Sequence, residues 1–188
     1  MYDMSYHATE KKISQELAQA LDAISETEVQ ALYTQITTAH RIFFVGVGRV
    51  LLALEALAKR LAHLGFQTTV VGAITEPAIT AQDLLIVGSG SGESVYPLAI
   101  TQKAKQFHAT VAHIGSNPHS SMNQWTDLFI QIPVQTKLNL PQEVPSIQPM
   151  TSLFEQSLWL LGDTLALMVI EQQHIQMNNL WQYHANLE

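Results

Sequence analysis

Cysteine is absent from this chain of 188 residues. Its absence excludes disulfide bonds, thiolate zinc sites and cysteine nucleophiles, and it is compatible with the cytoplasm, where we expect the protein to reside. Charged residues are also scarce, at 13% of the chain against 47% for hydrophobic residues. Because so apolar a chain has little charge with which to cover its outer surface, we expect further copies of the chain to bury part of it. The composition therefore predicts a homo-oligomer.

Basic residues are few as well: 9 Lys and Arg residues stand against 16 Asp and Glu residues, which gives a net charge of −7. This charge argues against a general nucleic-acid binder, which needs a basic surface. The N-terminus has no basic start followed by an apolar run, so we expect no signal peptide. The most apolar stretch, residues 158–170, spans about 13 residues and includes Asp163, so we expect it to be too short and too interrupted to cross a bilayer. Neither nucleic acid nor a membrane is an expected partner.

Helical and strand patterns alternate along the chain. Helical spacing of apolar residues covers two N-terminal segments, 6–21 and 26–39, and Ser25 is placed to cap the second of them. Further helices are predicted at 50–64, 95–107 and 150–172, with a short one at 119–124 and a shorter helix or tail at 181–188. Five short apolar runs are typical of buried parallel strands. The first begins at Arg41, and the others cover 67–71, 83–87, 110–114 and 127–132.

This alternation predicts the α/β class, with a single doubly wound domain over residues 1–188. Residues 41–132 would form the core, a five-stranded parallel sheet of order 2-1-3-4-5 with helices on both faces. Residues 1–40 would supply N-terminal helices, and residues 150–188 a C-terminal helix and tail. Residues 133–149 contain four of the seven prolines and no clear periodicity. They are therefore predicted to form a loop, and long loops in compact domains are often functional.

Glycine-rich turns follow the first and the third predicted strands. They are Gly46-Val-Gly48-Arg49 and Gly88-Ser-Gly-Ser-Gly-Glu-Ser94. In a doubly wound sheet, ligands bind beyond the carboxyl ends of the strands at the point where the strand order reverses. For the order 2-1-3-4-5 this point lies between the first and third strands, so the two turns mark the predicted binding site.

Three serine hydroxyls make the second turn suitable for a phosphate group. Ser89, Ser91 and Ser94 supply hydrogen-bond donors, and the glycines between them let backbone N–H groups approach an anion closely. The helix predicted after Ser94 adds its positive end. The alternative is a flexible turn in which Ser94 only caps that helix.

The first turn departs from the dinucleotide-binding fingerprint. Leu51 stands where the third glycine should be, and no acid closes the second strand, which argues against NAD. An FMN or nucleotide binder stays open, although a flavodoxin-like phosphate loop should follow the first strand rather than the third.

Glu155 and two histidines are further candidates. Ser152-x-x-Glu155 before an apolar run is a capping-box pattern, whereas a carboxylate near the cleft could act as a general base. His63 lies near a predicted helix end and His184 near the C-terminus, and each taken singly is typical of a surface or hydrogen-bonded histidine. No pair among the eight histidines has metal-ligand spacing, so we expect no metal.

Six short segments occur in an order typical of one enzyme family. They are Gly46-Val-Gly-Arg49, Arg60-Leu-Ala-His-Leu-Gly65, Ser89-Gly-Ser-Gly-Glu-Ser94, Ser116-Asn-Pro118, Pro149-Met-x-Ser-Leu-Phe-Glu155 and the terminal His184-Ala-Asn-Leu-Glu188. Together they resemble the 6-phospho-3-hexuloisomerase family of the sugar-isomerase (SIS) domain superfamily. The resemblance runs nearly end to end, and the last two segments are its most specific part.

The resemblance implies an enzyme that interconverts 3-hexulose 6-phosphate and fructose 6-phosphate by proton transfer through an enediol. It also implies a homotetramer, or dimer of dimers, with no metal or organic cofactor. By match to the family, His184 would reach into a neighbouring subunit. The implied site residues are the phosphate ligands Ser89, Ser91 and Ser94, the candidate base Glu155, the candidate acid or ring-opening group His184, and sugar contacts at Gly46, Gly48, Arg49 and His63.

Several positions depart from the family pattern. Val50 and Leu51 replace a serine and a glycine, Ala73 replaces an acid that is displaced to Glu76, Tyr183 replaces a basic residue, and Thr151 replaces a glycine. A lost hydroxyl-to-ligand hydrogen bond costs about 1–3 kcal/mol, so the altered wall could shift the substrate. Two functions stay open: a phosphosugar isomerase, with hexulose 6-phosphate as the leading substrate, and a non-catalytic phosphosugar-binding or regulatory protein that uses the same loop.

Overall fold

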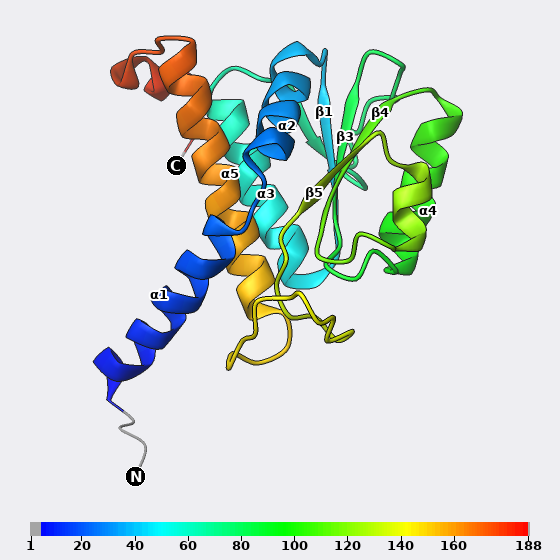
Figure 1. Ribbon diagram of the computed structural model, residues 1–188. Helices are drawn as coiled ribbons and strands as arrows, with labels where there is room; N and C mark the ends of the chain where they lie inside the picture. The colour runs from blue at the N-terminus through cyan, green and yellow to red at the C-terminus, as the bar shows by residue number, and fades with distance from the viewer. Residues whose placement is uncertain (1–4, 188) are drawn as a thin grey trace.

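A parallel sheet separates two layers of helices in the computed structural model, which describes residues 5–187 (Figure 1). Five strands form the sheet in the order β2-β1-β3-β4-β5, and every neighbouring pair is parallel. The predicted α/β class and the strand order 2-1-3-4-5 are confirmed. The strands are β1 (Ile42–Val45), β2 (Thr68–Val70), β3 (Leu84–Gly88), β4 (Thr110–Gly115) and β5 (Leu128–Gln131).

Helices cover both faces of the sheet, as predicted. In Figure 1, α2, α3 and α5 lie on one face and α4 lies on the other, while α1 projects from the body toward the N-terminus. The helices are α1 (Tyr6–Asp22), α2 (Glu26–Thr38), α3 (Gly48–His63), α4 (Val95–Gln106) and α5 (Ser152–Gln172), with 3-10 helices η1 (Ser121–Trp125) and η2 (Met177–Tyr183).

Alternate residues of each central strand feed two separate cores. Ile42 and Phe44 of β1 pack into the larger cluster under α2, α3 and α5. Phe43 and Val45 of the same strand pack into the smaller cluster on the α4 side. Because side chains of a strand point alternately to the two faces, a strand buried on both faces is apolar throughout. This is why the strands could be recognised as short apolar runs.

Most element boundaries follow local signals in the sequence. Ser25 caps α2 by accepting a hydrogen bond from the Glu28 N–H at 3.4 Å, as predicted. Gly65 follows the end of α3 with a φ of +91°, a conformation that favours glycine. The short helix expected at 119–124 is a 3-10 helix at Ser121–Trp125, and the one expected at 181–188 is a 3-10 helix at Met177–Tyr183. Of the predicted tail, residue 188 lies outside the described residues.

Helix α5 is longer than the apolar stretch that the sequence indicated. It contains 21 residues with a mean hydropathy of 1.4 over an 18-residue window, so by length and composition alone it could cross a membrane. The expectation that this segment is too short was therefore wrong. Half of that window is buried inside the protein, and Gly162 lets α5 approach Leu57 of α3 closely. These are the properties of a core helix.

A buried carboxylate ties the amino ends of β1 and β3 together. Asp83 is 1% exposed and accepts hydrogen bonds from Arg41 Nε at 3.1 Å and Nη2 at 2.9 Å. It also accepts from Thr80, at 2.7 Å from the backbone N–H and 2.8 Å from the hydroxyl. Burial by itself would raise the pKa of Asp83, but the hydrogen bonds from Arg41 and Thr80 and the Arg41 charge together hold it below its usual value.

We predict that Asp83→Asn lowers the free energy of unfolding by about 2–4 kcal/mol near pH 7, because the half-buried Arg41 loses its charged partner. Since the folded-state pKa of Asp83 lies below the unfolded value of about 3.9, this stabilisation is present above that value. It is lost as the pH falls through the folded-state pKa. Urea unfolding of both proteins should therefore show a smaller difference near pH 3 than near pH 7.

Asp163→Asn is the matched control for this variant. Asp163 is half exposed and lies 4.0 Å from Arg60, so its loss should cost less than about 1 kcal/mol. Equal losses for the two variants, or a difference that does not depend on pH, would contradict the structural role of Asp83.

Candidate active site

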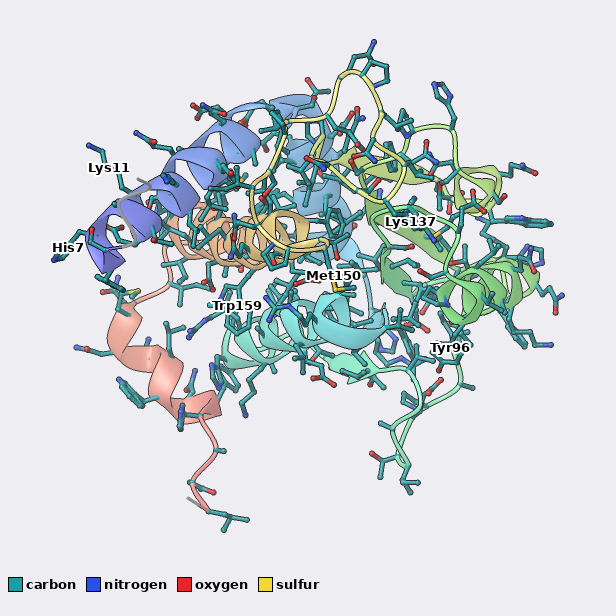
Figure 2. The ribbon with its side chains drawn as sticks, turned by 90° about the horizontal axis from the view of Figure 1, so that it is seen from below. His7, Lys11, Tyr96, Lys137, Met150 and Trp159 are labelled. Atoms are coloured by element: carbon teal, nitrogen blue, oxygen red, sulfur yellow. The ribbon has the colours of Figure 1, made fainter. Side chains whose placement is uncertain are left out.

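A cavity of about 850 Å³ opens at the carboxyl ends of β1 and β3. Figure 2 looks onto this side of the molecule, where Lys137 and Met150 are labelled. The strand order reverses at this point, so the cavity lies where ligands bind in doubly wound sheets. Its lining comes from residues 47–50 after β1, from the 88–94 turn after β3, from the loop before α5, and from Phe154 and Glu155 of α5.

The turn after β3, Gly88 to Ser94, has several hydrogen-bond donors without an acceptor in the protein and is called the phosphate loop below. Ser89, Ser91 and Ser94 all line the cavity. The Ser89 hydroxyl donates to the Ser94 hydroxyl at 3.1 Å and accepts from the Gly92 N–H at 3.1 Å. Within residues 5–187, the N–H groups of Gly90 and Ser91 have no hydrogen-bond partner. Hydroxyls and unpartnered N–H groups around a cavity form an anion-binding concavity.

Ser94 stands at the N-cap position of α4, but its side chain makes no capping hydrogen bond. The hydroxyl instead lies beside that of Ser89 in the cavity wall. The interpretation in which Ser94 only caps the helix is therefore wrong. The amino end of α4 meets the cavity at this residue, and its dipole favours negative charge there.

Glu155 faces the same cavity from the first turn of α5. Its side chain is 11% exposed, and its carboxylate pairs with the guanidinium of Arg49 and accepts a hydrogen bond from the Thr151 hydroxyl at 2.9 Å. The capping-box interpretation is wrong, because the N-cap residue is Thr151 and makes no side-chain cap. The Ser152 hydroxyl donates instead to the Pro149 carbonyl at 2.8 Å. Glu155 is thus a carboxylate of the cavity wall.

The loop between β5 and α5 covers the cavity and is organised by one carboxylate. Glu143 accepts hydrogen bonds from the Thr136 N–H at 3.2 Å and hydroxyl at 3.1 Å, from the Leu140 N–H at 2.9 Å and from the Ser116 hydroxyl at 3.1 Å. These contacts hold Thr136 and Lys137 at the cavity. The prolines of this loop indicated a functional segment, but its polar residues that line the cavity were missed: Gln135, Thr136, Lys137, Asn139 and Gln148.

The departure at Val50 gives the cavity an apolar wall. Val50 lines the cavity together with Val47. Its Cγ1 atom lies 2.7 Å from the position that a Cβ on Gly88 would take, so the valine packs directly over the backbone of β3. A hydroxyl is therefore missing at the position where the family pattern has a serine.

The two candidate histidines lie apart from the cavity of their own chain. His63 belongs to the last turn of α3, whereas the cavity lies at the first turn of that helix. His63 and His184 stack with ring centroids 5.2 Å apart, and Trp181 packs on His184 at 5.3 Å. Gly46 is also outside the cavity lining, where its backbone packs against Leu51 and Leu54.

The structure thus brings together six of the predicted site residues: Gly48, Arg49, Ser89, Ser91, Ser94 and Glu155. A carboxylate, a guanidinium and an anion-binding loop share one cavity, an arrangement suited to moving protons on a ligand held by its anionic group. Among residues 5–187, no group of three or more His, Asp or Glu side chains is placed to hold a metal ion.

Comparison with known proteins gives one consistent family. Residues 35–162 match the family described as SIS domain. A Bacillus subtilis (strain 168) protein named 3-hexulose-6-phosphate isomerase is 38% identical over 94% of this chain and 96% of its own length. A Mycobacterium gastri protein of the same name is 34% identical over 94% of this chain and 88% of its own length.

Solved structures agree with this assignment. The crystal structure of a Methanococcus jannaschii protein, described as inferring a molecular function of 3-hexulose-6-phosphate isomerase, has a TM-score of 0.83 and 26% sequence identity. The match covers 96% of this chain and 99% of that one. The chain therefore belongs to the SIS domain family and, within it, to the group of relatives named 3-hexulose-6-phosphate isomerase.

Proposed function

We propose that the chain, as a single SIS-like domain of residues 1–188, isomerises 3-hexulose 6-phosphate and fructose 6-phosphate. One observation carries this proposal: the donors of the phosphate loop and the Glu155 carboxylate face a common cavity. Similarity over nearly the full length to proteins named isomerases favours catalysis over the non-catalytic alternative.

The phosphate group of the substrate would occupy the phosphate loop. Ser91 and Ser94 would donate their hydroxyls, and Ser89 would turn its hydroxyl from Ser94 to the phosphate. The unpartnered N–H groups of Gly90 and Ser91 would complete the site. Lys137, exposed at the cavity, is a cation that could approach the phosphate from the opposite side. The phosphate would fix one end of the sugar and leave its carbonyl end to reach Glu155.

The reaction moves one carbon-bound proton. Glu155 would take the proton from C2 of the 3-hexulose, and the electron pair would form the C2=C3 double bond of an enediol as the C3 carbonyl oxygen gains a proton. Return of a proton to C3, with loss of the proton on the C2 oxygen, gives the 2-ketose. Arg49 and the Thr151 hydroxyl would orient the carboxylate for both steps.

A neighbouring subunit would complete the site. Beside Arg49 and Glu155 lies an apolar groove of about 350 Å³, whose walls include the exposed side chains of Leu52 and Trp159. We propose a cytoplasmic homotetramer in which another subunit covers this groove and brings its His63 and His184 to the cavity as sugar-binding and acid groups. The exposed apolar surface supports burial by a second copy.

We predict that Glu155→Gln lowers kcat for conversion of 3-hexulose 6-phosphate to fructose 6-phosphate by about a hundredfold to ten-thousandfold. The amide keeps the shape of the side chain but cannot take the proton, so KM should change little. The measurement is steady-state turnover of the purified proteins. Glu171→Gln at the exposed end of the same helix is the control and should match the wild type. Full activity in Glu155→Gln would remove the assigned base.

Ser94→Ala tests the phosphate loop separately. We predict that KM rises about tenfold and that inhibition by inorganic phosphate weakens by a similar factor, because one donor to the phosphate is lost. The value of kcat should change less, since the phosphate lies away from the reacting carbons. Ser14→Ala on α1, whose hydroxyl donates to the Glu10 carbonyl at 2.9 Å, is the control. Unchanged inhibition by phosphate would place the anion elsewhere.

Mixed oligomers test the contribution of the neighbouring subunit. We predict that Glu155→Gln and His184→Ala, each nearly inactive alone, regain about one quarter of wild-type activity when they are unfolded together and refolded, because one site of each mixed pair of subunits then has both groups. Glu155→Gln mixed with Ser94→Ala, which retains turnover, should show only the average of the two separate activities, because both changes fall in the cavity of one chain and no mixed pair restores a complete site. Absence of recovery in correctly assembled His184→Ala mixtures would contradict a shared site.

A further inference from the structure

A fully buried histidine lies directly beneath the phosphate loop. His113 of β4 is 0% exposed, and its Nε2 atom lies 3.0 Å from the carbonyl oxygen of Ser89. Its Nδ1 atom lies 2.6 Å from Asn123 Oδ1, and Phe129 packs on the ring with the centroids 5.1 Å apart. The proton-transfer steps proposed above do not use this imidazole, which is closed off from the cavity.

Two glycines, Gly92 of the loop and Gly115 of β4, lie against the imidazole. A Cβ atom on Gly115 would lie 2.6 Å from His113 Nε2, and a Cβ atom on Gly92 would lie 3.1 Å from His113 Cε1 and 2.2 Å from Ser120 Oγ. A side chain at 115 would collide with the imidazole and, at 2.8 Å, with the Ser89 carbonyl oxygen, whereas a side chain at 92 would collide first with Ser120. The imidazole is therefore packed tightly between β4 and the start of the loop.

Every carbonyl group at the start of the loop is held from the β4 side. The Ser89 carbonyl faces His113 Nε2 and also accepts from the Gly92 N–H within the loop at 3.1 Å. The Gly90 carbonyl accepts from the Ser116 and Asn117 N–H groups, and the Ser91 carbonyl accepts from Asn117 Nδ2. A carbonyl oxygen repels an anion. Turning these three carbonyls toward β4 leaves the N–H groups of Gly90 and Ser91 for a ligand.

We propose that His113 is a positioning residue for the phosphate loop: its Nε2–H donates to the Ser89 carbonyl and keeps that oxygen turned away from the bound phosphate. This inference rests on the proposed function of the loop. According to this inference, the buried His113 side chain, which does not line the cavity, controls the affinity for the phosphate group of the substrate.

The protonation state of the ring makes the proposal specific. Burial lowers the pKa of His113, although the hydrogen bonds with Asn123 and Ser89 act in the opposite direction, so the ring is neutral near pH 7 and has one N–H. Both neighbouring atoms are oxygens. The Ser89 carbonyl can only accept, so its contact with Nε2 calls for a proton on that nitrogen. The Asn123 NH2 group donates to the Pro118 carbonyl at 2.8 Å, which turns Asn123 Oδ1 toward Nδ1 and makes it compete for the same proton.

A matched pair of variants separates the two sides of the ring. The amide nitrogen of glutamine can take the place of Nε2, whereas the amide of asparagine reaches only as far as Nδ1. His113→Gln can therefore still donate to the Ser89 carbonyl, and His113→Asn cannot. We expect His113→Asn to raise KM and the inhibition constant of inorganic phosphate about tenfold, with kcat within about twofold of the wild type. His113→Gln should stay within about threefold in all three constants.

Two controls address stability. Both variants lose the imidazole from the same buried site, so thermal unfolding should show similar losses for the two. Thr101→Val, which removes a buried hydroxyl that donates to the Pro97 carbonyl within α4, should lower stability without changing the affinity for phosphate. Equal affinities for phosphate in His113→Asn and His113→Gln would overturn the proposal.

The position of the proton on the His113 ring can be measured in the wild-type protein. Nitrogen NMR of the His113 ring should show the proton on Nε2, and a ring with its only proton on Nδ1 would overturn the inference. Phosphate binding to the wild type distinguishes failure of the proposed function from failure of the role assigned to His113. A wild type that binds neither inorganic phosphate nor a sugar phosphate overturns the proposed function together with the inference. A wild type that binds, with no difference between the variants, overturns the inference alone.

Discussion

The pairing of β1 with β3 is the constraint on which the cavity depends. These strands are adjacent although β2 lies between them in the chain, and their register runs from Ile42 opposite Leu84 to Val45 opposite Val87. Their carboxyl ends therefore open at the same edge of the sheet. The first turn of α3, which follows β1, supplies Arg49, and the turn after β3 is the phosphate loop, so neither segment forms the site without the other.

The second requirement is that the phosphate loop directs N–H and hydroxyl donors into the cavity and its carbonyl groups away from it. The residues that follow β4, together with His113 within it, occupy the carbonyl groups of Ser89, Gly90 and Ser91. An anion site can then work in a protein with a net charge of −7, because backbone N–H groups and hydroxyls provide the attraction locally. The overall charge limits nonspecific binding of anions without preventing a specific one.

Packing of α5 against α3 brings a carboxylate to the cavity of the phosphate loop. Gly162 permits close approach of the two helices, and the first turn of α5 then holds Glu155 against Arg49 across the cavity. The same contact leaves an apolar groove beside the carboxylate, lined by Trp159 and Leu52. The phosphate loop and the carboxylate thus line one cavity of the same chain, while the His63–His184 stack lies at the far end of α3, away from that cavity.

Local patterns in the sequence were sufficient for the class of fold and the loop of serines, because periodicity, capping and glycine-rich turns act over a few residues. They could not show that Arg49 meets Glu155, 106 positions away, or that Ser152 and Glu155 do not form a capping box. They also gave no indication that Lys137 lines the cavity or that His113 supports the loop. Those contacts arise only when the sheet and the α3–α5 packing bring distant segments together, since a side chain's partners depend on the tertiary arrangement rather than on its neighbours in the chain.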